Sequence, residues 1–138
     1  MRRLLEFTNH LLKSLSTVMY PFAISCDEPL PDEEDLAEVA LGSAKALRDL
    51  HKTSFSTGRI CELLFSNWGS SIDWSYAVGN IKWSFAVELR DAGTYGFLLP
   101  PAQIKPSGEE LTSLLGYMLT FIAKVSHFST LLRPRCAD

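Results

Sequence analysis

The stretch SFAVELRDAGTYGFLLP, residues 84–100, decides the fold, because it is an apolar run of strand character that carries an acid and then breaks into a turn. Successive side chains of a strand point to opposite faces. One face therefore carries Trp83, Phe85, Val87 and Leu89, and the other carries Lys82, Ser84, Ala86, Glu88 and Arg90. The first face is expected to pack on a layer of helices. The second face places a carboxylate near the carboxyl end of the strand.

Two interpretations of Glu88 follow from this position. The first is a solvated acid on the polar face of an ordinary amphipathic strand, and the alternation by itself favours it. The second is a functional carboxylate, because ligand sites in open α/β sheets tend to lie outside the carboxyl ends of the strands.

Two helices are expected on either side of this strand. In the first, Asp32 is a candidate cap, acids at 33–35 suit the positive end of a helix, and one face carries Leu36, Val39, Ala40, Ser43, Leu47 and Leu50. In the second, Ser107 and Glu110 have the spacing of a capping box. Its predicted buried stripe consists of Leu111, Leu114, Leu115, Met118, Ile122 and Val125.

Short strands are expected between the helices, over residues 16–22, 58–65 and 82–89, with a turn or short helix over 72–78. Strands that alternate with helices predict a layered α/β fold. So few strands would leave a sheet edge without a partner, and such edges are a liability for a soluble protein.

The composition limits the classes of function. The chain has 138 residues, of which 46% are hydrophobic and 21% charged, as in a single globular domain. A net charge of −3 argues against nucleic acid as a partner. No apolar run reaches the roughly 18–20 residues that cross a membrane. The N-terminus has two arginines but an interrupted apolar core, so no signal peptide is predicted.

Cys26, Cys61 and Cys136 are widely spaced and form no CxxC pair, so a structural zinc site is not indicated. One disulfide with a free thiol and three reduced thiols fit the spacing equally well.

Two segments, GSSIDWSY at 69–76 and SFAVELRDAGTYGFLLPPAQI at 84–104, resemble the C-terminal half of zinc metallocarboxypeptidases of the pancreatic carboxypeptidase A and B type. The resemblance runs from Tyr20 to about residue 123. It implies a partial three-layer α/β/α fold with a mixed sheet over residues 16–124, preceded by an unmatched segment over 1–15 and followed by a tail over 125–138.

The resemblance also implies a role for individual residues. Glu88 falls at the general base, which in the family activates a zinc-bound water and passes the proton to the leaving amine. Ile72 falls at the base of the pocket for the C-terminal side chain, and an isoleucine there favours apolar or aromatic residues over Lys or Arg. Ile60 and Ala86 would line the same pocket, although plain core packing explains them equally well. Phe65 replaces a tyrosine whose hydroxyl touches the substrate.

Zinc is expected for the complete family domain, but no metal ligand is predicted in this chain. Its histidines, His10, His51 and His127, do not form the family's His-x-x-Glu pair. The chain is therefore expected to lack hydrolytic activity by itself. The alternatives are a non-catalytic module that binds peptide C-termini and a truncated, non-functional product. The resemblance further implies an extracellular location, a peptide or protein C-terminus as partner, and a monomer when complete.

Overall fold

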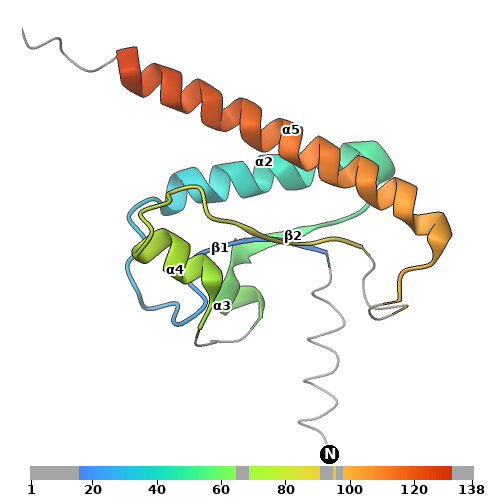
Figure 1. Ribbon diagram of the computed structural model, residues 1–138, viewed down its shortest axis with the longest axis horizontal. Helices are drawn as coiled ribbons and strands as arrows, with labels where there is room; N and C mark the ends of the chain where they lie inside the picture. The colour runs from blue at the N-terminus through green and yellow to red at the C-terminus, as the bar shows by residue number, and fades with distance from the viewer. Residues whose placement is uncertain (1–15, 65–68, 91–94, 96–97, 132–138) are drawn as a thin grey trace, which may run out of the picture.

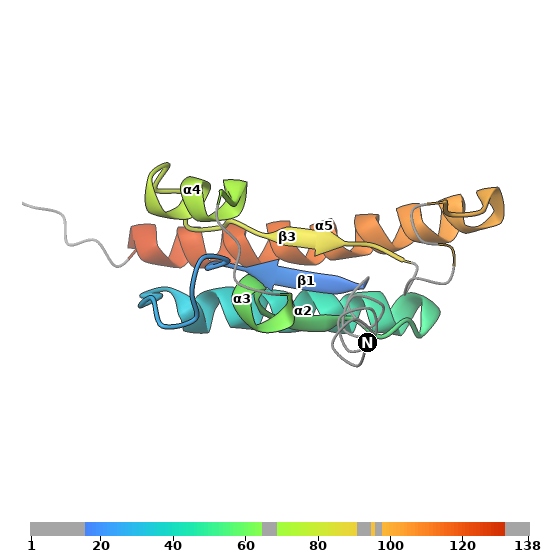
Figure 2. The same ribbon diagram turned by 90° about the horizontal axis from the view of Figure 1, so that it is seen from below.

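The computed structural model describes residues 16–64, 69–90, 95 and 98–131 of the chain. Two long helices cover one face of a small sheet, and two short helices lie on its other side (Figures 1 and 2). The elements are β1 (Thr17–Tyr20), α2 (Glu33–His51), β2 (Ser56–Arg59), α3 (Ile60–Leu63), α4 (Ser71–Ala77), β3 (Ala86–Glu88) and α5 (Pro101–Leu131). The expected helix over 72–78 is confirmed as α4.

The sheet has the strand order β2-β1-β3 and is mixed. β1 pairs in parallel with β2, with Thr17 opposite Ser56, and antiparallel with β3, with Thr17 opposite Glu88. The expected partial α/β/α architecture with a mixed sheet is therefore confirmed. The direction of β3 corrects one argument from the sequence: the carboxyl end of β3 lies beside the amino end of β1, so the rule for parallel strands does not locate a site at Glu88.

The main core lies between the sheet and the helices α2 and α5. Val18 and Tyr20 of β1 point into it together with Trp83, Phe85 and Val87 of the β3 segment, as the alternation predicts. The helices contribute Leu36, Val39, Ala40, Leu47, Leu114 and Met118. α2 and α5 approach closely at Gly42, where an added Cβ would lie 2.0 Å from the hydroxyl of Tyr117. A side chain at this position is therefore excluded unless the tyrosine moves.

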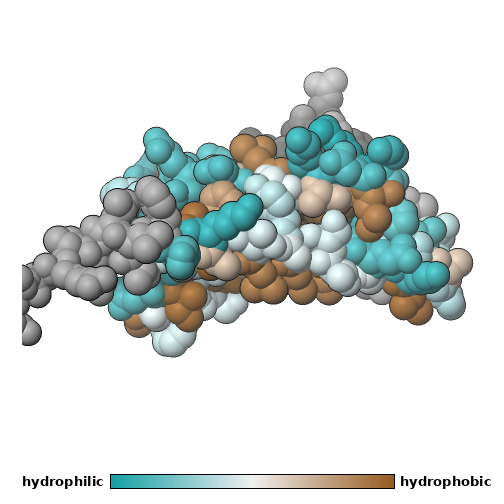
Figure 3. Space-filling model, turned by 90° about the horizontal axis from the view of Figure 1, so that it is seen from above, coloured by the Kyte–Doolittle hydropathy of each residue, from teal (hydrophilic) through white to brown (hydrophobic). Residues whose placement is uncertain are grey.

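Two residues of the predicted helix stripes are exposed. Leu50 on α2 and Leu115 on α5 have 46% and 45% of their surface accessible. Leu50 lies in the last turn of α2, and Leu115 directly follows Leu114, which together with Met118 faces the core. Apolar areas among charged ones accordingly remain on the face that α2 and α5 present to solvent (Figure 3).

The predicted strand over 58–65 is correct only at residues 58 and 59, because β2 covers Ser56–Arg59. The strand ends at Arg59, and Ile60–Leu63 forms the short helix α3. The side chain of Glu62 accepts the amide of Arg59 at 3.1 Å, which satisfies a donor at the start of this helix. An apolar run of this length does not distinguish a strand from a helical turn.

Of the two predicted helix caps, the one at Ser107 is wrong, and the one at Asp32 is correct in position but makes no side-chain bond. Ser107 and Glu110 lie inside α5, which begins earlier, at Pro101, where a proline is favourable because its missing N–H is not needed. The side chain of Asp32 makes no capping hydrogen bond. Its carboxylate instead accepts the hydroxyl of Tyr76 at 2.8 Å and pairs with Lys82 at 2.8 Å.

The division of the chain into an unmatched segment over 1–15, a family segment over 16–124 and a tail over 125–138 stays a prediction. The helix α5 continues across the boundary at 124/125 and ends at Leu131. Within the described ranges, none of the helices combines the length and the apolar character needed to span a membrane.

Candidate functional site

Glu88 is the last residue of β3 and is half-buried. The hydroxyl of Thr17, which is fully buried on β1, donates to its carboxylate at 3.4 Å. Burial raises the pKa of Glu88 above the ordinary 4.5, and the hydrogen bond from Thr17 opposes part of that rise. Glu88 is thus a partly desolvated carboxylate rather than one in bulk water.

This environment predicts how Glu88 titrates. In Thr17→Val the pKa of Glu88 should rise further, because the carboxylate loses the hydrogen bond that favours its charged form. Titration of the ¹³C-labelled carboxyl carbon by NMR measures both values. An unchanged or lower pKa in the variant would contradict the assigned contact.

The raised pKa also links Glu88 to the pH dependence of stability. Because the pKa of Glu88 is higher in the folded than in the unfolded chain, its contribution to stability is complete below the unfolded pKa and is lost as the pH rises through the folded pKa.

The predicted pocket residues lie together on the sheet face that points away from α2 and α5. Ile60 is buried in a small apolar cluster with Met19 and Ala23, and Ile72 and Ala86 pack against that cluster. Ala86 and Glu88 are two residues apart on β3, so they share this face and lie about 6–7 Å apart along the strand. Phe65, the remaining predicted site residue, lies outside the described residues.

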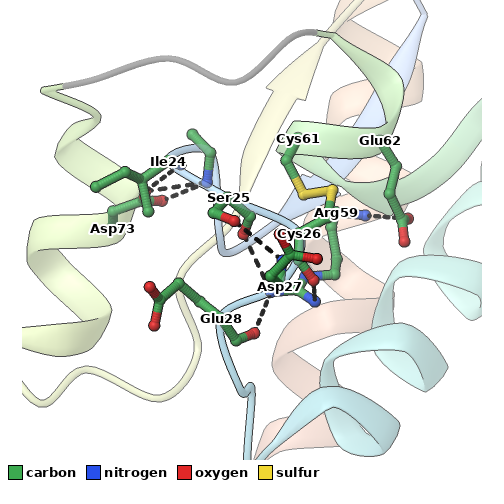
Figure 4. Close-up of a disulfide and its surroundings, with 10 residues drawn as sticks. Ile24, Ser25, Cys26, Asp27, Glu28, Arg59, Cys61, Glu62 and Asp73 are labelled. Carbon is green, nitrogen blue, oxygen red and sulfur yellow. Dashed lines mark hydrogen bonds between the residues drawn. A yellow bond between two sulfur atoms is a disulfide. The ribbon is translucent and has the colours of Figure 1, made fainter.

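Asp73 fixes the position of its neighbour Ile72, a role that the sequence pattern did not reveal. Its carboxylate accepts the amide of Ala23 at 2.9 and 3.0 Å and the amide of Ile24 at 3.0 Å (Figure 4). α4 is thereby attached to the loop that follows β1. The sequence shows an acid directly after Ile72. It does not show the partners of this acid, because they are backbone amides 49 and 50 residues away.

The same loop is fastened to the start of α3 on its other side. Cys26 and Cys61 form a disulfide, which settles the pairing that the spacing left open. The buried guanidinium of Arg59 donates to the carbonyls of Cys26 at 2.9 Å and Glu28 at 2.7 Å (Figure 4). Ile60 lies in the sequence between Arg59 and Cys61, the two residues that are bonded to this loop. The loop over residues 21–28 therefore holds both Ile60 and Ile72 in place.

A buried ion pair holds the chain just after Glu88. Arg90 bonds to Glu110 of α5 through two nitrogens, one of them at 2.9 Å from Oε2, and also donates to Gln103 at 2.7 Å and Thr53 at 3.1 Å. The alternation predicted Arg90 on the same face as Glu88, and this is wrong. β3 ends at Glu88, and the side chain of Arg90 turns to the helix layer to pair with Glu110.

Among the described residues, no group of three or more His, Cys, Asp and Glu side chains could hold a metal ion. His51 pairs with Glu109 at 2.9 Å, at the far end of α2. His10 lies outside the described residues.

The comparisons with known proteins decide the family. The family model for zinc carboxypeptidases matches residues 8–113, which is most of the chain. This chain belongs to the zinc carboxypeptidase family. Carboxypeptidase A2 from Mus musculus is 50% identical over 93 residues, and carboxypeptidase A1 from Homo sapiens is 44% identical over 93 residues. Each match covers 67% of this chain but 22% of the relative, so the chain spans about a fifth of the length of these proteins.

A solved structure supports the same assignment. Bovine thrombin-activatable fibrinolysis inhibitor, in complex with tick carboxypeptidase inhibitor, superposes with a TM-score of 0.75 at 29% identity. The superposition covers 89% of this chain and 45% of that one. The family is named for zinc, yet the described residues do not form a zinc site.

Proposed function

We propose that this chain supplies the catalytic carboxylate and the apolar specificity pocket of a metallocarboxypeptidase that removes apolar or aromatic C-terminal residues. The observation that carries the proposal is the common cluster of Ile60, Ile72 and Ala86 on the sheet face that also bears the half-buried Glu88. The family match and the identity to carboxypeptidases A1 and A2 support it.

The proposed role of Glu88 is proton transfer. A carboxylate whose pKa is raised by burial is a better base toward water than a fully solvated one. Glu88 would accept a proton from the attacking water and return it to the amine that leaves as the peptide bond breaks. β3 is held by β1 on one side and followed by the Arg90–Glu110 pair, so the carboxylate is presented from a rigid support.

The proposed selectivity follows from the pocket. The side chains of Ile60, Ile72 and Ala86 are apolar and carry no counter-charge, so an ammonium or guanidinium group placed among them would lose its hydration without compensation. An aromatic or aliphatic C-terminal side chain would instead gain from leaving water.

By itself, the chain is proposed to bind peptide ends without cleaving them. The support is that Ile60, Ile72 and Ala86 belong to one apolar cluster, while the described residues hold no group suited to a metal. The same observation favours the second candidate function, a non-catalytic module that recognises peptide C-termini.

A titration with short peptides tests the pocket. Acetyl-Ala-Ala-Phe should shift the methyl NMR signals of Ile60 and Ile72, and acetyl-Ala-Ala-Lys should need at least about tenfold higher concentration, because its charge is not compensated. Ile72→Asp should reverse this order by supplying a carboxylate. Equal response to both peptides in the wild type, or shifts confined to other residues, would contradict the pocket.

A hydrolysis assay separates the two candidate functions. The purified chain with added zinc should not cleave acetyl-Ala-Ala-Phe. Turnover that Glu88→Gln abolishes would show that the chain is a complete enzyme and would contradict the non-catalytic proposal, while leaving the pocket intact.

An extracellular location is proposed for the protein. The disulfide between Cys26 and Cys61 supports it, because such bonds persist in oxidising compartments and are rare in the cytosol.

A further inference from the structure

A cleft lies away from the candidate site, between α2 and the edge strand β2. Its volume is about 180 Å³, and we call it the α2–β2 cleft. It is lined by Leu41, Ala44, Lys45 and Arg48 of α2, by Ser54 and Phe55 of the connecting loop, and by Thr57 of β2. The lining thus combines two cations, two hydroxyls and an apolar floor, and it contains no acid.

The cations of the cleft are available to a ligand. Lys45 and Arg48 are exposed and are three residues apart, so they lie on the same side of α2. Among the side chains that the structure describes, neither forms an ion pair, whereas Lys82 and Arg90 are both paired with acids. An anionic group in the cleft would therefore meet two cations without having to displace an existing partner.

The strand beside the cleft has a free edge. β2 is the outer strand in the order β2-β1-β3, and among the described residues no strand pairs with its other side. The amide of Ser56 donates to the carbonyl of Ser16 on the β1 side at 3.0 Å, and that of Arg59 donates to the carboxylate of Glu62 at 3.1 Å. Backbone groups of successive strand residues point to opposite edges, so the amide and carbonyl of Thr57 face the free edge and remain able to pair with an added strand.

The register fixes what an added strand would present. Thr57 lies opposite Val18, whose side chain is in the core under α2, so Thr57 points to the same side of the sheet as the cleft. An extended peptide beside β2 would send every second side chain to that side. We propose that the α2–β2 cleft binds an extended peptide with acidic residues at alternate positions, its backbone pairing with β2 and its carboxylates meeting Lys45 and Arg48.

The peptide acetyl-Thr-Glu-Val-Glu-Thr-amide is the probe, titrated into the ¹⁵N-labelled full chain. It should shift the amides of Thr57 and Gly58 with a dissociation constant at or below about 1 mM. Binding should weaken when salt is raised, because exposed charge pairs are screened. Lys45→Glu/Arg48→Glu should remove it, whereas Lys105→Glu, at a side chain 87% exposed on α5, should not.

Three further ligands, an N-methylated peptide, a lysine peptide and inorganic phosphate, test strand pairing and charge separately. The same peptide with N-methylated glutamates cannot complete the backbone pairing and should lose most of the affinity. The lysine counterpart should not bind. Equal binding of the N-methylated peptide, or of inorganic phosphate alone, would overturn strand addition. No binding of the acidic peptide would mean that the cations only protect the edge from aggregation, and it would overturn the proposal altogether.

Discussion

Arg90→Met should lower the free energy of unfolding by about 3–5 kcal/mol, the usual penalty for leaving a buried charge without its partner. Glu110 is fully buried, and its carboxylate is bonded to two nitrogens of Arg90 and to the hydroxyl of Thr53 at 2.7 Å. Methionine keeps much of the length of the arginine but cannot donate a hydrogen bond. The carboxylate would then be charged in an apolar setting or would take up a proton.

Urea unfolding of a matched set of variants checks this expectation. The double variant Arg90→Met/Glu110→Leu should be more stable than Arg90→Met, because it removes the orphaned charge together with its partner. Lys105→Ala is the control, since its ion pair with Glu109 is long, at 3.9 Å, and exposed, and it should change stability by less than about 0.5 kcal/mol. A loss in Arg90→Met as small as in the control would contradict the assigned burial of the pair.

The pH dependence gives a second measure of the same pair. Burial raises the pKa of Glu110, but the hydrogen bonds from Arg90 and Thr53 outweigh it and hold the pKa below the ordinary 4.5. A lowered folded pKa contributes stability that is present above the unfolded pKa and is lost as the pH falls through the folded one. In Glu110→Gln, the free energy of unfolding should no longer show the decrease at acid pH that protonation of Glu110 causes.

The pattern of the 84–100 stretch predicted the part of the fold that depends on strand alternation. Trp83, Phe85 and Val87 enter the helix-covered core, while Ala86 and Glu88 face the other side. The direction of β3 was not accessible in this way, because alternation is the same for parallel and antiparallel pairing. The resemblance, rather than the pattern, brought Ile60 and Ile72 into one predicted pocket.

Local sequence motifs gave wrong predictions where the role of a residue depends on a partner that is distant in the sequence. Ser107 and Glu110 have the spacing of a capping box, yet Glu110 is occupied by Arg90, twenty residues earlier in the chain. Asp73 and Arg59 are bonded to backbone groups of the loop after β1, and backbone partners leave no pattern in the sequence. These contacts form only once β1, α3 and α4 are brought together.

The double variant Cys26→Ser/Cys61→Ser should lose about 4 kcal/mol of stability, because the disulfide closes a long loop and so restricts the unfolded chain. The bond joins residues 35 apart in the sequence. The candidate pocket should also become less stable. Cys61 directly follows Ile60, and the amide of Cys61 donates to the carbonyl of Phe22 at 3.0 Å. With the bond absent, the loop over 21–28 would still be bonded to Arg59, Asp73 and the amide of Cys61.

Unfolding in urea with and without a reductant tests the disulfide against a general effect of the substitutions. Reduction should bring the wild type to the stability of Cys26→Ser/Cys61→Ser, and the double variant itself should not respond to the reductant. Amide hydrogen exchange should accelerate most around residues 22–26 and 60–63, where the loop meets α3. Equal stability of the oxidised wild type and the variant would contradict the role of this bond in holding the loop at the pocket. Faster exchange confined to α2 and α5 would also contradict it, because these helices pack on the sheet through a separate core.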